Sequence, residues 1–116
     1  MSITRIGAGP RMSKAVVHGN TVYLAGQVAD ATKGESVAEQ TTEILGIIDG
    51  ILKVAGSDKS KLVWTNIWLS DISTFAEMNS VWDKWVIAGQ GPARATVEAR
   101  LAGPDYKVEI AVVAAV

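Results

Sequence analysis

The segment from Leu62 to Leu69 constrains the fold most, because large apolar side chains occur at both of its alternating sets of positions. Successive side chains of a β-strand point to opposite faces of the sheet, so a strand here presents apolar groups on both faces. The chain must therefore cover both faces of the sheet that contains this strand. One set is Leu62, Trp64, Asn66 and Trp68, and the other is Val63, Thr65, Ile67 and Leu69.

Two amphipathic helices are predicted, one on each side of this strand in the chain. Ser36 and Glu39 have the capping-box spacing that satisfies free amides at a helix start, and Thr74 and Glu77 repeat it. Apolar residues then recur at helical spacing in both segments. The first stripe is Val37, Ile44, Leu45, Ile48, Ile51, Leu52 and Ala55, ending before Gly56; the second is Phe75, Met78, Trp82 and Trp85, ending before Gly89.

Further β-rich segments complete the expected order β-β-α-β-α-β-β. A hairpin is predicted at Gly19-Asn20, a dipeptide suited to the positive φ angles of a tight turn. The pattern predicts an α+β fold in one domain, residues 1–116, with two helices on one face of a single sheet. The predicted strands are Lys14–His18, Thr21–Ala25, Leu62–Leu69, Ala93–Ala99 and Lys107–Val116, the last two being joined by a turn with Gly103-Pro104-Asp105.

The second sheet face needs a cover that the two helices do not supply. Trp64 and Trp68 lie on one face of the strand, and each would remove about 200 Å² from water if fully buried. Edge packing within a monomer is one way to cover them. A closed oligomer that buries the sheet faces of its protomers is the interpretation we favour.

Composition excludes several classes of function. Eleven basic and twelve acidic residues give a formal net charge of -1, which provides no basic field for nucleic acid or an anionic membrane. The absence of cysteine excludes disulfides, thiolate nucleophiles and cysteine-ligated zinc. No apolar run approaches the roughly 20 residues of a membrane span, and no secretory signal begins the chain. We therefore expect a cytoplasmic protein.

Arg94 is the most informative candidate for a binding site, because it follows Gly91-Pro92-Ala93 inside a strand of small residues. On that strand Arg94, Thr96 and Glu98 share one face. A guanidinium group there can bind a planar carboxylate with two parallel hydrogen bonds. The alternative, which the residues alone leave equally open, is an interface arginine paired with the acid of a neighbour.

Glu109 is the corresponding acidic candidate. It lies within the apolar strand that begins at Lys107, where burial raises a carboxyl pKa and suits the group to proton transfer. The alternative role is that of a salt-bridge partner. His18, the one histidine, would have to carry a catalytic triad or a histidine metal cluster alone, so neither is favoured, and no metal site is predicted.

Several of these segments together resemble the Rid family, formerly called YjgF-type proteins, and especially its short YoaB-like members. The resemblance runs over nearly the whole chain. It implies a homotrimer with a chorismate-mutase-like arrangement and three clefts between protomers. It also implies cofactor-free hydrolysis of reactive 2-imino or 2-enamino acids to 2-keto acids and ammonia. The matching segments are Val22 to Gln27, Met78-Asn79, Gly91 to Arg94, Val97-Glu98 and Lys107 to Ile110.

The resemblance also assigns roles to individual residues. Arg94 matches the arginine that grips the substrate carboxylate, and Glu109 matches the glutamate that orients or activates water. Gly26 and Thr96 match positions whose backbone groups line the same cleft, and Asn79 matches an asparagine near it. We place these three residues and Met12 among the substrate-binding residues. The chain departs from the family pattern at two cleft positions: Met12 stands where many deaminating members have tyrosine, and Thr96 where several have cysteine.

Other functions are compatible with this architecture. A trimer that binds carboxylates or proteins without turnover would keep the same cleft. Chorismate mutase activity would rest on architecture alone, which does not fix function. The balanced charge and the lack of basic residues interleaved with aromatic ones disfavour a ribonuclease.

Overall fold

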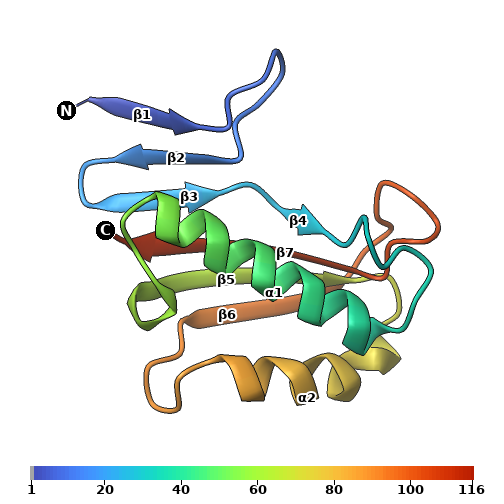
Figure 1. The fold of residues 1–116 in the computed structure, drawn as a ribbon. Helices are drawn as coiled ribbons and strands as arrows, with labels where there is room; N and C mark the ends of the chain where they lie inside the picture. Colours follow the sequence, from blue (N-terminus) through green and yellow to red (C-terminus); the bar gives the residue numbers. More distant parts are fainter. Residues whose placement is uncertain (1) are drawn as a thin grey trace.

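A computed structural model describes residues 2–116 as a two-layer structure, with one sheet and two helices on one of its faces (Figure 1). This confirms the predicted α+β class and the placement of both helices. The strand order is β1-β2-β3-β7-β5-β6, and β4 also pairs with β7. The elements are β1 (Ile3–Ile6), β2 (Ala15–His18), β3 (Thr21–Leu24), β4 (Gln27–Val28), α1 (Val37–Val54), β5 (Leu62–Leu69), α2 (Phe75–Trp85), β6 (Ala93–Glu98) and β7 (Val108–Ala115), with short 3-10 helices η1 (Lys59–Lys61) and η2 (Ile72–Thr74).

The strand pairings follow from the connections between strands. β2 and β3 form the predicted antiparallel hairpin, in which Gly19 alone takes a positive φ, of 63°. β5 and β6 are parallel because α2 carries the chain back across the sheet, and β6 is thereby an edge strand. β7, the last strand, enters the middle of the sheet between β3 and β5.

Helix α1 supplies most of the core between the two layers. Its predicted cap is confirmed, since the Ser36 hydroxyl oxygen accepts a hydrogen bond of 3.1 Å from the Glu39 amide. Gly56 takes a φ of 82° just beyond its end, as a C-terminal stop requires. The core residues of α1 pack on strand residues that face the helices. The helix contributes Ile44, Leu45, Ile48 and Leu52, and the strands contribute Ile67, Leu69, Val108 and Ile110.

The start and end of α2 differ from the prediction. Thr74 makes no side-chain cap; its hydroxyl donates instead to the Asp71 carbonyl, and the Asp71 carboxylate accepts from the Ser73 amide to cap η2. A short 3-10 turn thus takes the place of the predicted capping box. The helix ends at Trp85, so the segment before Gly89 is a loop. Two short strands, β1 and β4, escaped prediction because they have few residues and weak alternation.

A register shift in β5 corrects the predicted division of its faces. The pairing of β5 with β7 skips Val63, so that Leu62 pairs with Ala114 and Trp64 with Val113. A bulge of this kind flips the alternation of the strand. Leu62 is therefore buried with the helix-side residues, whereas Trp64 stays on the opposite face. The predicted grouping of Leu62 with Trp64 was wrong.

The sheet face opposite the helices is bare in the protomer. The molecule measures 42 × 37 × 21 Å, and its thinnest dimension accommodates only two layers. Tyr23, Trp64 and Val97 remain 49%, 38% and 50% exposed on this face. Large apolar groups in neighbouring strands thus form an uncovered surface, which we call the open face.

Candidate functional site

Arg94 lies on the edge strand β6, on the face that carries the helices. It pairs with Thr65 of β5, which is fully buried under the helix layer. The guanidinium carbon lies 5.2 Å from the ring centroid of Trp82 and 5.7 Å from that of Phe75, both in α2. Burial lowers the pKa of Arg94, while the negative charge of Asp83 acts to raise it. Within residues 2–116 no carboxylate forms an ion pair with this guanidinium.

Asn79 belongs to the same corner of the molecule. It follows Phe75 by four positions and precedes Trp82 by three, so all three side chains lie on one face of α2. Phe75 and Trp82 both contact Arg94, and the Asn79 side chain between them is half-buried. Asn79 therefore belongs to the face of α2 that meets Arg94.

Two threonine hydroxyls near Arg94 have no hydrogen-bond partner within residues 2–116. Thr96 lies two residues further along β6 on the same face, and Thr65 is the strand neighbour of Arg94. The hydroxyl oxygens of both are buried and unpaired. Buried polar groups are almost always hydrogen-bonded, so these two hydroxyls are polar atoms near Arg94 that no group of residues 2–116 satisfies.

Glu109 lies on the open face of the sheet, away from Arg94. It pairs with Trp68 of β5 and with Val28 of β4. Burial raises its pKa above the ordinary glutamate value of 4.5. Gly26 borders the carboxylate so closely that a Cβ there would come within 2.2 Å of Oε2 of Glu109. The absence of a side chain at Gly26 is therefore required by the position of Glu109.

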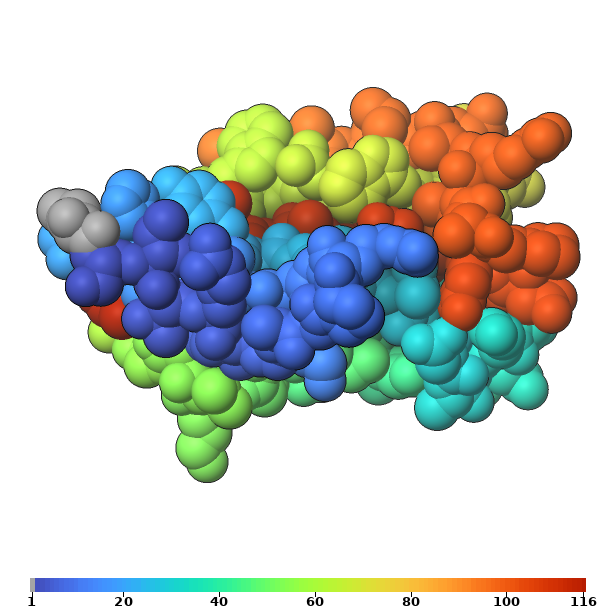
Figure 2. All heavy atoms as spheres, turned by 90° about the horizontal axis from the view of Figure 1, so that it is seen from above, coloured from blue at the N-terminus to red at the C-terminus, as the bar shows by residue number. Residues whose placement is uncertain are grey.

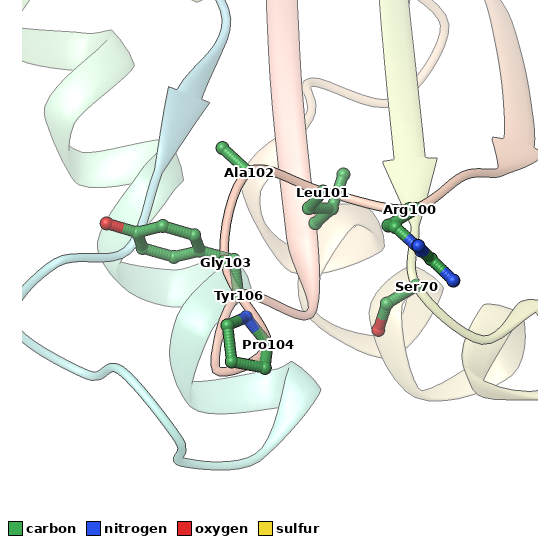
Figure 3. Close-up of a pocket in the computed structure, with 7 residues that line it drawn as sticks. All are labelled: Ser70, Arg100, Leu101, Ala102, Gly103, Pro104 and Tyr106. Carbon is green, nitrogen blue, oxygen red and sulfur yellow. The ribbon is translucent and has the colours of Figure 1, made fainter.

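The Glu109 carboxylate borders a hollow of about 230 Å³ that is also lined by Trp68 and residues 99–102. Arg100, Leu101 and Ala102 also line a second hollow, of about 470 Å³, whose other walls include Ser70 and Tyr106 (Figure 3). None of the predicted site residues lines this second hollow. Figure 2 shows the β6–β7 loop (orange) at the same end of the molecule as residues near 30–35 (cyan), and the Gly34 amide donates to the Asp105 carbonyl there.

Met12 lies at the opposite side of the sheet from Arg94. It belongs to the loop between β1 and β2 and is 58% exposed. Lys14, at the end of this loop, accepts a hydrogen bond from the Ala25 amide, which places the loop beside Gly26. Four strand spacings separate β2 from β6, or about 19 Å at 4.8 Å each.

The predicted site residues thus fall into two groups that the protomer does not bring together. The arginine group, Arg94, Thr96 and Asn79, lies at the β6 edge beside α2. The glutamate group, Glu109 and Gly26 with the nearby Met12 loop, belongs to the open face and the N-terminal side of the sheet.

Comparison with known proteins identifies the family. A family described as Endoribonuclease L-PSP matches residues 2–116. The RutC family protein YoaB of Escherichia coli strain K12 is 47% identical over 116 residues, which is all of both chains. The crystal structure of a YjgF-family protein from Neisseria meningitidis superimposes with a TM-score of 0.95 at 45% identity, covering 99% of this chain and 95% of that one. The chain belongs to the Rid family, which includes the RutC and YjgF proteins.

Names within the Rid family differ in the activity they suggest. A structure from Salmonella typhimurium, 45% identical with a TM-score of 0.89 over 99% of this chain and 98% of that one, is described as a putative translation initiation inhibitor. The description of the matching family names an endoribonuclease. The names differ in the activity they suggest, although the proteins share one family and one fold.

Sequence reasoning missed three residues of the arginine group's surroundings. The sequence pattern places Phe75 and Trp82 in the apolar stripe of a helix and Thr65 on one face of a strand. The spacing of the two aromatic residues is compatible with a shared contact, but nothing in the sequence places β6 against α2.

In the part of this Rid chain that the structure describes, no cluster of three or more metal-ligating side chains occurs, and neither helix is long and apolar enough to span a bilayer.

Proposed function

We propose that this Rid protein hydrolyses 2-imino and 2-enamino acids to 2-keto acids and ammonia without a cofactor. The observation that carries the proposal is the Arg94 guanidinium, which is half-buried against two rings and bound to no carboxylate of residues 2–116. Such a group is prepared for a small carboxylate, because its planar fork matches two carboxylate oxygens. Membership of the Rid family supports the same assignment.

The reaction requires orientation and proton transfer. Arg94 holds the substrate carboxylate, and Glu109 accepts a proton from a water molecule as that water adds to the imine carbon. Glu109 passes this proton to the imine nitrogen, which gives a carbinolamine. The proton of the carbinolamine hydroxyl group then moves to the nitrogen through the same carboxylate, the carbon–nitrogen bond breaks, and ammonia leaves as the carbonyl forms. An enamine first gains a proton at its β-carbon to give the same imine. Fixed geometry and a positioned base are sufficient for such an electrophilic carbon.

Joining the two groups of residues requires a second copy of the chain. The arginine group of one protomer would face the glutamate group of its neighbour, so each contact joins two different surfaces. Such head-to-tail contacts form a closed ring when the rotation from one protomer to the next returns to the first protomer. A homotrimer with three such clefts would also cover Tyr23, Trp64 and Val97 on the open face, which are exposed in the protomer.

The trimer is directly measurable. Light scattering coupled to chromatography should give about three times the protomer mass of 12.2 kDa at micromolar concentration. Val97→Asp, on the open face, should dissociate the assembly, because it places a charge in a buried apolar contact. Val54→Asp is the matched control, since Val54 is 71% exposed at the end of α1. A folded wild-type monomer would overturn the assembly of the two groups across protomers.

Gly26→Ala tests the position of the Glu109 carboxylate. The added methyl group would overlap Oε2 of Glu109, so the carboxylate must move and the hydrolysis rate should fall at least tenfold. Gly46→Ala is the control, because a Cβ at Gly46 meets nothing within 4 Å. Both variants should remain folded by circular dichroism. Full activity of Gly26→Ala would remove Glu109 from the proposed site.

A non-catalytic carboxylate-binding trimer is the second candidate. It is favoured by Met12, which supplies no hydroxyl group near the glutamate group, whereas the Arg94 guanidinium is held against Trp82 and is bound to no carboxylate of residues 2–116. Imines generated in situ by an amino-acid oxidase or lyase distinguish the two candidates. The deaminase accelerates their decay and the release of ammonia. The binding protein takes up 2-keto acids with no change in that decay.

A further inference from the structure

The Arg94 guanidinium is held by aromatic rings rather than by an acid. Trp82 is 5% exposed and belongs to the core, while Phe75 is 40% exposed at the start of α2. The ring centroids lie 5.2 Å and 5.7 Å from the guanidinium carbon, within the range of cation–π attraction. Two separate rings of one helix therefore contact the same cation.

The spacing of the two rings places the guanidinium over the middle of α2. Phe75 and Trp82 are separated by seven positions, or about 10.5 Å along the helix axis. A group that contacts both rings lies over the intervening turn, which carries Asn79. Arg94 extends there from a separate strand, so its position depends on the packing of β6 against α2.

Aromatic rings restrain an arginine side chain without neutralising its positive charge. A bound carboxylate would neutralise the guanidinium and take up two of its five N–H donors. A ring face attracts the cation through its quadrupole and leaves those donors for a ligand. Burial against the rings also strengthens the interaction with an incoming anion, because it removes competing water.

We propose that Phe75 and Trp82 are positioning residues that fix the orientation of the Arg94 fork for the substrate carboxylate. The proposal rests on the function assigned above, but its mechanism is a property of the arginine group alone. A restrained fork loses less rotational freedom when the ligand binds than a free arginine does. Removing a ring therefore weakens carboxylate capture and leaves the hydrolytic step on the bound substrate nearly unchanged.

Phe75→Leu is the decisive variant, because Phe75 is partly exposed and leucine preserves its apolar contact. We expect the Kd for 2-oxobutanoate, measured by calorimetry, and the KM for 2-iminobutanoate to rise by about two- to thirtyfold, with kcat within about twofold. Phe75→Tyr should keep wild-type binding because the ring is retained. Ile72→Ala is the matched control, since Ile72 is 44% exposed in the adjacent η2 and has no aromatic ring to offer the guanidinium.

Arginine NMR gives a readout that does not depend on turnover. The Arg94 Nε–H signal should be ordered in the wild type and in Phe75→Tyr, and more mobile in Phe75→Leu, while melting temperatures stay similar. An equally ordered signal and an unchanged Kd in Phe75→Leu would overturn the positioning role, as would equal losses in Ile72→Ala. Ordered Arg94 with ring-dependent binding but no ammonia release would instead overturn only the deaminase assignment.

Discussion

Arg94→Ala should lower kcat/KM for 2-iminobutanoate by at least about a hundredfold while the protein remains folded. Hydrogen bonds to charged groups contribute about 1.5 to 3 kcal/mol each, and the fork supplies two of them. The loss exceeds that expected from Phe75→Leu, because the alanine removes the cation itself. Rates with the same imine, after circular dichroism and chromatography of each protein, measure the effect.

Two further variants separate charge from geometry at this position. Arg94→Lys keeps the cation but loses the planar fork, so only a minor part of the activity should return. Arg5→Ala controls for the loss of a positive charge elsewhere, since Arg5 is exposed on β1 at the far edge of the sheet. Near-normal turnover by a folded Arg94→Ala protein would refute the mechanism. Loss of the trimer in Arg94→Ala would indicate an interface ion pair instead.

Glu109→Gln should reduce deamination by about a hundredfold to ten-thousandfold, the usual range for a positioned general base. Glutamine retains the size of the side chain and much of its hydrogen bonding but cannot take a proton. Glu98→Gln is the control: the Glu98 carboxylate accepts from the Ile72 amide at 3.0 Å, which is a structural contact near η2. A harmless Glu109→Gln beside a damaging Glu98→Gln would show that the wrong acid has been assigned.

The pH dependence of the reaction follows from the environment of Glu109. Burial raises its pKa above 4.5, so the carboxylate is lost at a higher pH than for an exposed glutamate. The fall of kcat/KM toward acid pH should therefore be centred above that value.

The same pKa shift disfavours the ionised form of Glu109 in the folded state, so Glu109→Gln should gain stability over the wild type as pH rises through this region. The two should be equally stable where the carboxyl is protonated in both folded and unfolded chains.

The sequence predicts correctly those elements whose signals lie within a few neighbouring residues. The bounds of β5 were predicted correctly, and the Ser36 cap of α1 follows from a short-range hydrogen bond. The bulge at Val63 was not predictable, because it is set by the pairing of β5 with β7. The predicted cap at Thr74 was wrong because the Thr74 hydroxyl donates to the Asp71 carbonyl, and Asp71 caps the short helix η2 that precedes α2.

The sequence indicates which residues are candidates for the site, but not how they are arranged in space. The strand alternation correctly placed Arg94 and Thr96 on one face, and burial raises the pKa of Glu109 as its apolar strand suggested. The aromatic contacts of Arg94 and its separation from Glu109 depend on strand order, which pairs β6 with β5 at one edge and leaves β7 in the middle. A pattern in one segment carries no information about this order.

Mixing two inactive variants tests the central claim, a deaminase site shared between protomers. Arg94→Ala and Glu109→Gln proteins would be unfolded together in equal amounts, refolded, and assayed with 2-iminobutanoate. Random assembly pairs an intact Arg94 with an intact Glu109 in about a quarter of the clefts, so about a quarter of the wild-type rate should return. Each variant refolded alone should remain inactive. No recovery in a mixture shown by mass spectrometry to contain mixed trimers would contradict a site built from two copies of the chain.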